Sequence, residues 1–322
     1  MNEKETMLKK NRGVYFLAND RVFDLAIAFL NSFRQYNPDI PLCLIPFDNE
    51  FSRIKQMQTR YNFSIYTKME ICKVCDEISK EFHGYILGAY RKLAIWEGDF
   101  EEFVYIDVDT VVLENIGFVF EFLSEYEFLT SHSNISSIIK FVWQESIYRS
   151  GRLTKEQIEY AASTGFIASK KHVLRLDTIK ANLADALQLA SHMTLYCMEQ
   201  PFLNFLIVTS GQRYSSLRYL YYRTTPQEIR LEHWAGGKGG RVTNGRIVFT
   251  DNRPPTMLVH WAGKWQPTRS DRLVSTLLRR LRIKKSNILP TIRFFMPYKK
   301  LWRHYRFLHD RKTNCQNTAQ LS

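Results

Sequence analysis

A run of apolar and aromatic residues that contains two aspartates, Phe103–Val112, constrains this chain more than any other feature. The residues before the aspartates are aromatic or aliphatic, and a second apolar run, Val111–Leu113, follows them. This pattern predicts a buried strand near the centre of a parallel sheet. Carboxylates at the end of such a strand are costly unless a positive charge meets them.

The two carboxylates, Asp107 and Asp109, are two residues apart. Because side chains alternate along a strand, both are expected on one side, with Val108 on the other. Paired carboxylate oxygens suit Mg²⁺ or Mn²⁺, and such an ion could hold a diphosphate. The alternative is an Asp-x-Asp turn exposed to solvent, so the rest of the chain has to decide between the two interpretations.

Composition indicates a globular protein. The chain has 322 residues, of which 45% are hydrophobic and 14% aromatic, enough for one large or two modest domains. No apolar run reaches the ~18 residues of a membrane-spanning helix, and the first twelve residues are charged rather than signal-like. We expect a cytoplasmic protein without a disulfide framework, in which Cys72 and Cys75 are reduced and structural because no second ligand pair accompanies them.

The first part of the chain predicts a βαβ unit. Strands are expected at 13–18 and 42–47, with a helix between them that has apolar residues at helical spacing. Such a unit implies a parallel sheet with a right-handed crossover. Ligands bind beyond the carboxyl ends of parallel strands. Asp20 and Asp48 follow the two strands, so we expect them to face the same crevice as the Asp-x-Asp pair.

The remaining elements follow from periodicity and turn residues. Helices are predicted at 52–61, 90–96, 116–126, 137–148 and 173–190, and another begins at Pro201. A short strand is predicted at 63–66, a turn entering a strand at 163–169, a hairpin around Asn244-Gly245, and a strand at 257–259 that ends next to His260. The tetrapeptide His-Trp-Ala-Gly occurs twice, at His233 and His260. We favour His260 as a site residue because it ends a strand and is followed by a lysine.

These motifs, in this order, resemble the family 8 glycosyltransferases, and within them the glycogenin-like pattern. The resemblance runs from Val14 to Pro267. It rests on Asn19-Asp20, Lys92-Leu93, Tyr105–Val112 with Asn115-Ile116, Glu199-Gln200 with Leu203-Asn204, and His260-x-x-Gly263. It implies an α/β fold of the A type, with a Rossmann-like, mostly parallel central sheet flanked by helices, and a retaining transferase that uses a UDP-sugar.

The resemblance also implies residue roles. Asp107, Asp109 and His260 would bind the metal, usually Mn²⁺ in this family; an imidazole ligand favours Mn²⁺, although Mg²⁺ remains possible. Donor contacts are implied for Asn19 and Asp20 at the uracil or ribose, and for Lys92 at the phosphates or sugar. Gly263 would let the backbone approach the diphosphate, with Lys264 beside it. The turn residues Ser163 and Gly165 would contact substrate, and Gln200 with Glu199 would lie near the anomeric carbon.

Alternatives accompany these roles. His260 could be a strand-end histidine without a ligand, Lys92 a solvated helix residue, and Glu199 a surface charge. The sequence also departs from the family pattern. Lys264 directly follows Gly263, Gln266 stands where a lysine is usual, Glu199-Gln200 replaces Asp-Gln, and Ser163 replaces an asparagine. These departures bear on which sugar and which acceptor the protein uses, and they leave the predicted metal and nucleotide sites intact.

Nearly all of the net charge of +13 lies near the C-terminus. Residues 269–312 contain 14 Lys and Arg but only two Asp, and aromatic and aliphatic residues are interleaved with them. This composition favours peripheral contact with an anionic membrane surface, on its cytoplasmic face. A packed terminal helix is the second interpretation, and nucleic-acid binding is an unlikely third.

The sequence therefore predicts an N-terminal extension (1–12), a glycosyltransferase domain (13–268) and a basic, amphipathic C-terminal extension (269–322). The expected activity is transfer of a hexose from a UDP-sugar to a glycan or glycolipid acceptor, such as a lipid-linked or surface polysaccharide. The alternatives are a non-catalytic protein that binds membrane or nucleic acid through its tail, and a sugar nucleotidyltransferase. The sequence predicts no particular oligomeric state.

Overall fold

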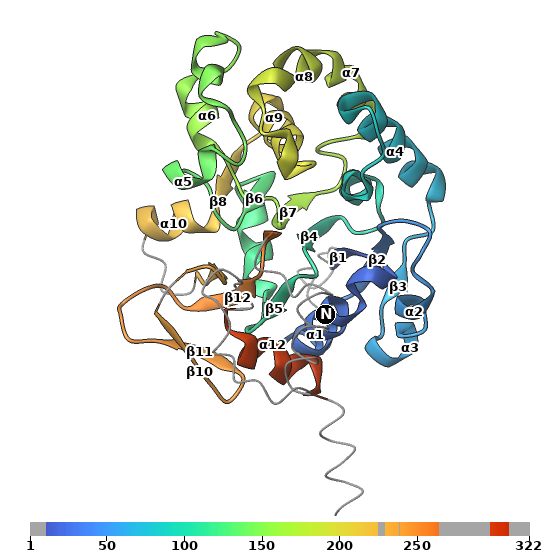
Figure 1. The fold of residues 1–322 in the computed structure, drawn as a ribbon, viewed down its shortest axis with the longest axis vertical. Helices are drawn as coiled ribbons and strands as arrows, with labels where there is room; N and C mark the ends of the chain where they lie inside the picture. Colours follow the sequence, from blue (N-terminus) through green and yellow to red (C-terminus); the bar gives the residue numbers. More distant parts are fainter. Residues whose placement is uncertain (1–10, 225–228, 238, 264–296, 309–322) are drawn as a thin grey trace, which may run out of the picture.

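The computed structural model describes residues 11–224, 229–237, 239–263 and 297–308. Its centre is a seven-stranded sheet with the strand order β3-β2-β1-β4-β7-β6-β8 (Figure 1). Neighbouring strands are parallel except that β7 is antiparallel to both β4 and β6. The predicted, mainly parallel sheet is confirmed. Its strands are β1 (Arg12–Ala18), β2 (Leu42–Pro46), β3 (Ser64–Ile65), β4 (Glu102–Ile106), β6 (Phe128–Thr130), β7 (Phe166–Lys170) and β8 (Tyr214–Ser216).

A second, three-stranded sheet adjoins the first and has the order β5-β12-β9. It consists of β5 (Thr110–Val112), β9 (Leu231–Trp234) and β12 (Thr256–His260), with β12 antiparallel to β5 and parallel to β9. Only Asp107–Asp109 separates β4 in the first sheet from β5 in the second. The Asp-x-Asp motif thus forms a turn where the chain passes from one sheet to the other.

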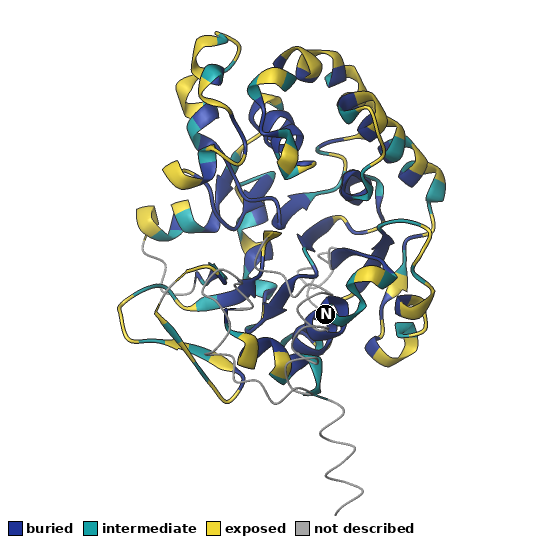
Figure 2. Ribbon diagram, viewed as in Figure 1, coloured by how far each residue is buried: buried dark blue, intermediate teal, exposed yellow. Residues whose placement is uncertain are grey.

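Strands β1, β2 and β4 of the large sheet are buried on both faces, which explains their continuous apolar sequences. Along β1, Tyr15 and Leu17 belong to one hydrophobic cluster, whereas Val14 and Phe16 belong to another. Helix α1 packs into the second cluster, and α4, α7, α8 and α9 cover the first. Figure 2 shows the buried strands inside and the exposed residues on the outer sides of the helices.

The longer helices are α1 (Phe23–Tyr36), α4 (Met69–His83) and α9 (Gln200–Thr209). The sequence analysis did not anticipate α4, which places Cys72 and Cys75 in the core; the four described cysteines are free. Three predicted helices are shorter or interrupted: α2 (Ser52–Lys55) with α3 (Gln58–Tyr61), α5 (Ser136–Ile139) with the 3₁₀ turn Glu145–Arg149, and α7 (Leu176–Ala181) with α8 (Leu183–Leu189).

The predicted helices at 90–96 and 116–126 are instead 3₁₀ segments, Gly88–Glu97 and Gly117–Ser124. Shorter 3₁₀ turns occur at Asp20–Val22, Ala190–His192 and Leu195–Cys197, and the remaining α-helices are α6 (Lys155–Tyr160) and α10 (Leu217–Thr224). In 88–97 eight of the ten side chains are buried. Packing on every side therefore determines the conformation of this segment, and helical periodicity in the sequence does not predict it.

The predicted hairpin is confirmed as β10 (Gly240–Thr243) and β11 (Arg246–Phe249), joined through Asn244 and Gly245, both with positive φ. Helix α12 (Lys299–Arg306) packs against α1 (Figure 1). The Asn31 side chain donates to the Tyr305 carbonyl at 2.7 Å, and Arg306 lies 2.9 Å from Asp24. The described part of the basic extension is therefore packed on the domain.

The apolar face of α12 is buried, since Leu301, Trp302 and Tyr305 are at most 8% exposed. Of the predicted basic extension, residues 269–296 and 309–322 lie outside the described residues. Among the residues that the structure describes, no helix is long and apolar enough to cross a membrane.

Candidate active site

A cleft of about 520 Å³ lies at the carboxyl ends of β1 and β4, where the two sheets meet. Residues far apart in the sequence line it, and most of the predicted site residues are among them: Asn19, Lys92, Asp107, Asp109, Ser163, Gly165, Glu199, Gln200, His260 and Gly263. Asp20 and Asp48 are not part of its lining. The predicted convergence on one crevice therefore holds for Asp107 and Asp109 and is wrong for Asp20 and Asp48.

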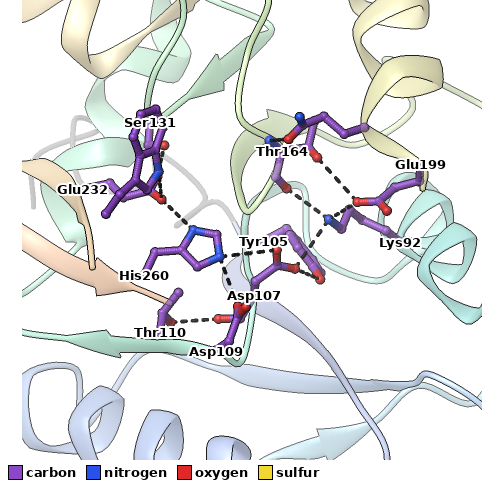
Figure 3. Close-up of polar contacts among 12 residues, drawn as sticks. Lys92, Tyr105, Asp107, Asp109, Thr110, Ser131, Thr164, Glu199, Glu232 and His260 are labelled. Atoms are coloured by element: carbon purple, nitrogen blue, oxygen red, sulfur yellow. Dashed lines mark hydrogen bonds and ion pairs between the residues drawn. The ribbon is translucent and has the colours of Figure 1, made fainter. Parts of the chain in front are cut away.

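The centre of the cleft is formed by Asp107, Asp109 and His260 (Figure 3), from each of which a ligand atom lies within 4.8 Å of the others. His260 Nε2 is 3.1 Å from Asp109 Oδ1 and 4.0 Å from Asp107 Oδ2. The turn is fixed because Thr110 Oγ1 donates to the Asp107 carbonyl at 2.7 Å. Val108 points into the core, so both aspartates face the cleft although they lie in a turn and not in a strand.

Two backbone features bring His260 to the aspartates. The last residue of β12 is His260, which pairs with Thr110 of β5, and the Trp261 amide donates to the Asp109 carbonyl at 2.9 Å. Gly165 leaves the space for the imidazole. A Cβ at Gly165 would lie 2.4 Å from His260 Cε1 and 3.0 Å from Asp107 Oδ2, closer than side chains can approach without a shift.

Behind His260 lies Glu232, a residue that the sequence analysis did not identify. Its carboxylate is fully buried, and Oε1 is 2.6 Å from His260 Nδ1. The same oxygen accepts a hydrogen bond from Trp234 Nε1 at 2.7 Å, and the Ser131 hydroxyl donates to Oε2. Burial favours the neutral form of Glu232, but His260 and His132 outweigh it and hold the pKa of this carboxyl well below its usual range.

His260 therefore lies between two carboxylates. Burial lowers the pKa of His260, but the charges of Asp109 and Glu232 outweigh this effect and raise the pKa well above its usual value. The imidazolium is the stable form when only these carboxylates surround it. Two aspartates and one imidazole nitrogen are also a suitable donor set for Mn²⁺, and for Mg²⁺ with less preference. These residues could hold a divalent cation.

A second buried cation, Lys92, lies on the other side of Asp107. Its ammonium is 2.5 Å from Glu199 Oε1 and 3.4 Å from Asp107 Oδ1, and it donates to the Thr164 carbonyl at 3.1 Å. Burial lowers the pKa of Lys92, but the charges of Asp107 and Glu199 outweigh it and raise the pKa overall. Lys92 is thus a buried charge with specific partners, and Glu199 is buried beside it; neither is a solvated surface residue.

Tyr105 completes this side of the cleft. Its hydroxyl donates to Asp107 Oδ1 at 2.6 Å, and its ring lies under the Lys92 ammonium, with the nitrogen 4.5 Å from the ring centre. Burial and then the negative charge of Asp107 raise the pKa of Tyr105 well above its usual value. The hydroxyl therefore keeps its proton and holds the first carboxylate in place.

The 163–165 turn faces the N-terminus of α9 across the cleft. The Thr164 amide donates to Gln200 Oε1 at 3.3 Å, and Gln200 Nε2 donates to the Phe141 carbonyl at 3.1 Å. The Gln200 side chain is therefore held at both ends beside the turn. Helix α9 begins at Gln200, with Pro201 in its first turn as predicted.

The polar residues after β1 and β2 lie at the edge of the cleft. Asn19 Nδ2 donates to Asp48 Oδ2 at 2.6 Å, so these two side chains are joined. The Asp20 carboxylate accepts hydrogen bonds from the amides of Arg53 and Ile54 and caps α2 instead of entering the cleft. Gly263 lines the cleft with φ of +58°, a conformation that favours glycine. Lys264 and Gln266 lie outside the described residues.

Comparisons with known proteins agree with this architecture. No family model matches the chain, and no curated protein matches it. The apo structure of the bifunctional glycosyltransferase WbbM is similar, with a TM-score of 0.51 and 13% identity over 81% of this chain and 48% of that chain. This chain thus spans about half of the WbbM chain.

The galactosyltransferase LgtC, in complex with donor and acceptor sugar analogues, is also similar. Its TM-score is 0.50 and its identity 13%, over 87% of this chain and 98% of that chain. At this identity the likeness establishes the fold. The chain has the A-type glycosyltransferase fold, as its sequence predicted.

Proposed function

We propose that this protein is a metal-dependent glycosyltransferase that moves a hexose from a UDP-sugar to a glycan or glycolipid acceptor. The observation that carries the proposal is the convergence of Asp107, Asp109 and His260 in a cleft at the carboxyl ends of the strands. Ligands of open α/β sheets bind at this edge. The fold shared with glycosyltransferases supports a nucleotide-sugar as the ligand.

In this reaction the bond between the anomeric carbon and the diphosphate breaks, and UDP leaves with the electron pair. A bond from the acceptor oxygen to the anomeric carbon forms, and the proton of the acceptor hydroxyl passes to the departing diphosphate, so that atoms and charge balance. When bound, a divalent cation supplies positive charge that stabilises the departing diphosphate. The triad residues would hold this ion, and the site would bind Mn²⁺ in preference to Mg²⁺ because one ligand is an imidazole.

The chain's own residues supply the remaining stabilisation. Lys92 is a fixed positive charge on the other side of Asp107, and pre-positioned charges of this kind lower the cost of developing negative charge. Asn19 offers a polar group for the nucleoside, and Asp48 holds its amide in place. Gln200, held beside the 163–165 turn, is proposed to lie near the anomeric carbon, with Glu199 orienting Lys92. Membership of family 8, and with it retention of configuration, is proposed on the motifs shared with that family.

The proposal is tested by measuring UDP release from a panel of UDP-sugars with and without Mn²⁺. We expect one UDP-sugar to be hydrolysed in a Mn²⁺-dependent manner by the wild type and by His233→Ala, the matched control in the other His-Trp-Ala-Gly tetrapeptide. Asp109→Ala and His260→Ala should be inactive. Turnover that survives both of these substitutions, or that needs no divalent cation, would contradict the proposed site.

We also propose peripheral contact with an anionic membrane through the basic residues that follow 268. Charge supports this proposal: α12 exposes Lys299, Lys300 and Arg303. Because the apolar face of α12 is buried, its contribution would be electrostatic, about 1 kcal/mol per basic residue at the surface. Co-sedimentation with phosphatidylserine vesicles should be strong at low salt and weak at high salt. Equal binding to neutral phosphatidylcholine vesicles would contradict it.

A further inference from the structure

The buried carboxylate of Glu232 has no part in the cleft surface, yet it contacts a residue of the triad. Strands β9 and β12 are parallel neighbours, and their register pairs Trp234 with His260. Because side chains alternate, Glu232 projects to the same side as Trp234, two residues on. This register places the carboxylate 2.6 Å from His260 Nδ1, on the side of the imidazole away from the aspartates.

The partners of Glu232 decide which tautomer His260 adopts. The indole of Trp234 can only donate, and the Ser131 hydroxyl donates to the other carboxylate oxygen. A carboxylate that accepts these bonds is ionised and acts as an acceptor only, so His260 Nδ1 carries a hydrogen toward it. The other nitrogen, Nε2, faces Asp109 at 3.1 Å, so it is Nε2 that would give up its proton and offer its lone pair to a cation bound by the aspartates.

We propose that Glu232 is a positioning residue that fixes the orientation and tautomer of His260 for metal binding. The inference rests on the proposed function, because it assumes that the triad binds a divalent cation. Glu232 acts through His260 and touches neither the ion nor the substrate. Partners of this kind commonly determine the affinity of a metal site, and their loss weakens binding by about 10–100-fold.

The test is a Mn²⁺ titration of the full chain, with free Mn²⁺ followed by electron paramagnetic resonance in the presence and absence of UDP. Glu232→Gln should bind Mn²⁺ about 10–100-fold more weakly than the wild type. The matched control is Glu102→Gln. Glu102 is another buried glutamate, paired with Arg12 at 2.8 Å near the start of β4, and its substitution should leave Mn²⁺ affinity unchanged.

A double substitution separates positioning from a general structural role. If Glu232 acts through His260, Glu232→Gln should weaken Mn²⁺ binding no further in a His260→Ala background. An equal loss in both backgrounds would overturn the inference. Should Glu232→Gln fail to fold, Glu232→Asp keeps the charge but withdraws it from Nδ1, and it should also weaken binding; wild-type affinity in this variant would overturn the inference.

The titration distinguishes a failure of the proposed metal site from a failure of the proposed role of Glu232. A wild type that binds no Mn²⁺ under either condition refutes the proposed metal site, and the inference falls with it. A wild type that binds Mn²⁺ together with a Glu232→Gln variant of equal affinity refutes only the role of Glu232.

Discussion

The two His-Trp-Ala-Gly tetrapeptides are identical in sequence, but the structure brings only the second into the cleft. Their histidines lie on the adjacent parallel strands β9 and β12. The two tetrapeptides are offset by one residue, so that His233 pairs with Val259 and His260 pairs with Trp234. Side chains of paired residues in a parallel sheet project to the same side. His233 therefore points to the face opposite from His260.

The two histidines differ accordingly in their surroundings. The His233 ring forms a hydrogen bond with the Tyr298 hydroxyl at 3.1 Å. Burial, and then the charge of Arg253, lowers the pKa of His233 to about 4. His260 lies between Asp109 and Glu232, and its pKa is raised. Strand register, and not the local motif, therefore decides which histidine lies beside the two aspartates.

The largest expected difference in activity is between variants of the two glycines that lie beside the two histidines. A Cβ at Gly165 would lie 2.4 Å from His260 Cε1, and one at Gly237 would lie 3.0 Å from His233 Cε1. Gly165→Ala should reduce Mn²⁺-dependent UDP release by about 100-fold, because it displaces the imidazole by an ångström or so. Gly237→Ala should release UDP at the wild-type rate. Equal losses in the two variants would contradict the different roles of the two histidines.

A smaller effect, on stability and on Mn²⁺ affinity, is expected from substituting the tryptophan of each tetrapeptide. Trp261 is fully buried and donates to the Pro297 carbonyl at 2.7 Å, whereas the half-buried Trp234 donates to Glu232. In urea unfolding, Trp261→Phe should lower the free energy of unfolding by about 1–3 kcal/mol, since a buried carbonyl loses its partner. Mn²⁺ affinity should not change.

Trp234→Phe should show the opposite pattern. Its cost in unfolding free energy should be about 0.5–1.5 kcal/mol, and it should weaken Mn²⁺ binding less than Glu232→Gln does. If Trp234→Phe left the Mn²⁺ affinity unchanged and Trp261→Phe reduced it, the roles of the two tryptophans would be the reverse of those predicted.

The smallest effect concerns the pH dependence of stability. His233 has a pKa of about 4 in the folded protein and about 6.5 in an unfolded chain. Between these values the unfolded chain binds more protons, so the free energy of unfolding decreases as the pH falls through this range, and the contribution is fully present above it. Urea unfolding at about pH 7 and about pH 5 should show a smaller decrease for His233→Phe. An unchanged decrease would mean that His233 does not titrate as described.

Much of the fold could be predicted because its strongest signals are local. The continuous apolar runs of β1, β2 and β4 predict buried strands, and Asn244-Gly245 predicts the hairpin. Predictions were least accurate where tertiary packing outweighs periodicity, as in the 3₁₀ segment 88–97. The turn at Asp107–Asp109 was also hidden, because apolar residues on both sides of the aspartates conceal the passage from one sheet to the other.

Site residues could be predicted only where the sequence carries a recognisable pattern. The Asp-x-Asp pair, Lys92 and Glu199 belong to motifs, and all of them line the cleft. Asp20 matches a motif too, but its carboxylate caps α2. Glu232 belongs to no motif, since its position opposite His260 depends on the register of β9 and β12. An acidic residue between Leu231 and the aromatic His233-Trp234 was the only available signal, that of a charge within a strand-like sequence.

The packing of the last described helix against α1 has a consequence for the order of folding. Asn31 bonds to Tyr305, 274 residues away, and β12 likewise reaches back to β5. Closing such long loops costs little additional stability, because the entropy grows only with the logarithm of loop length. Contacts of large sequence separation nevertheless slow folding. We therefore expect His260 to join the two aspartates late in folding, and if the triad binds Mn²⁺ as proposed, Mn²⁺ binding during refolding would report the completion of the fold rather than its nucleation.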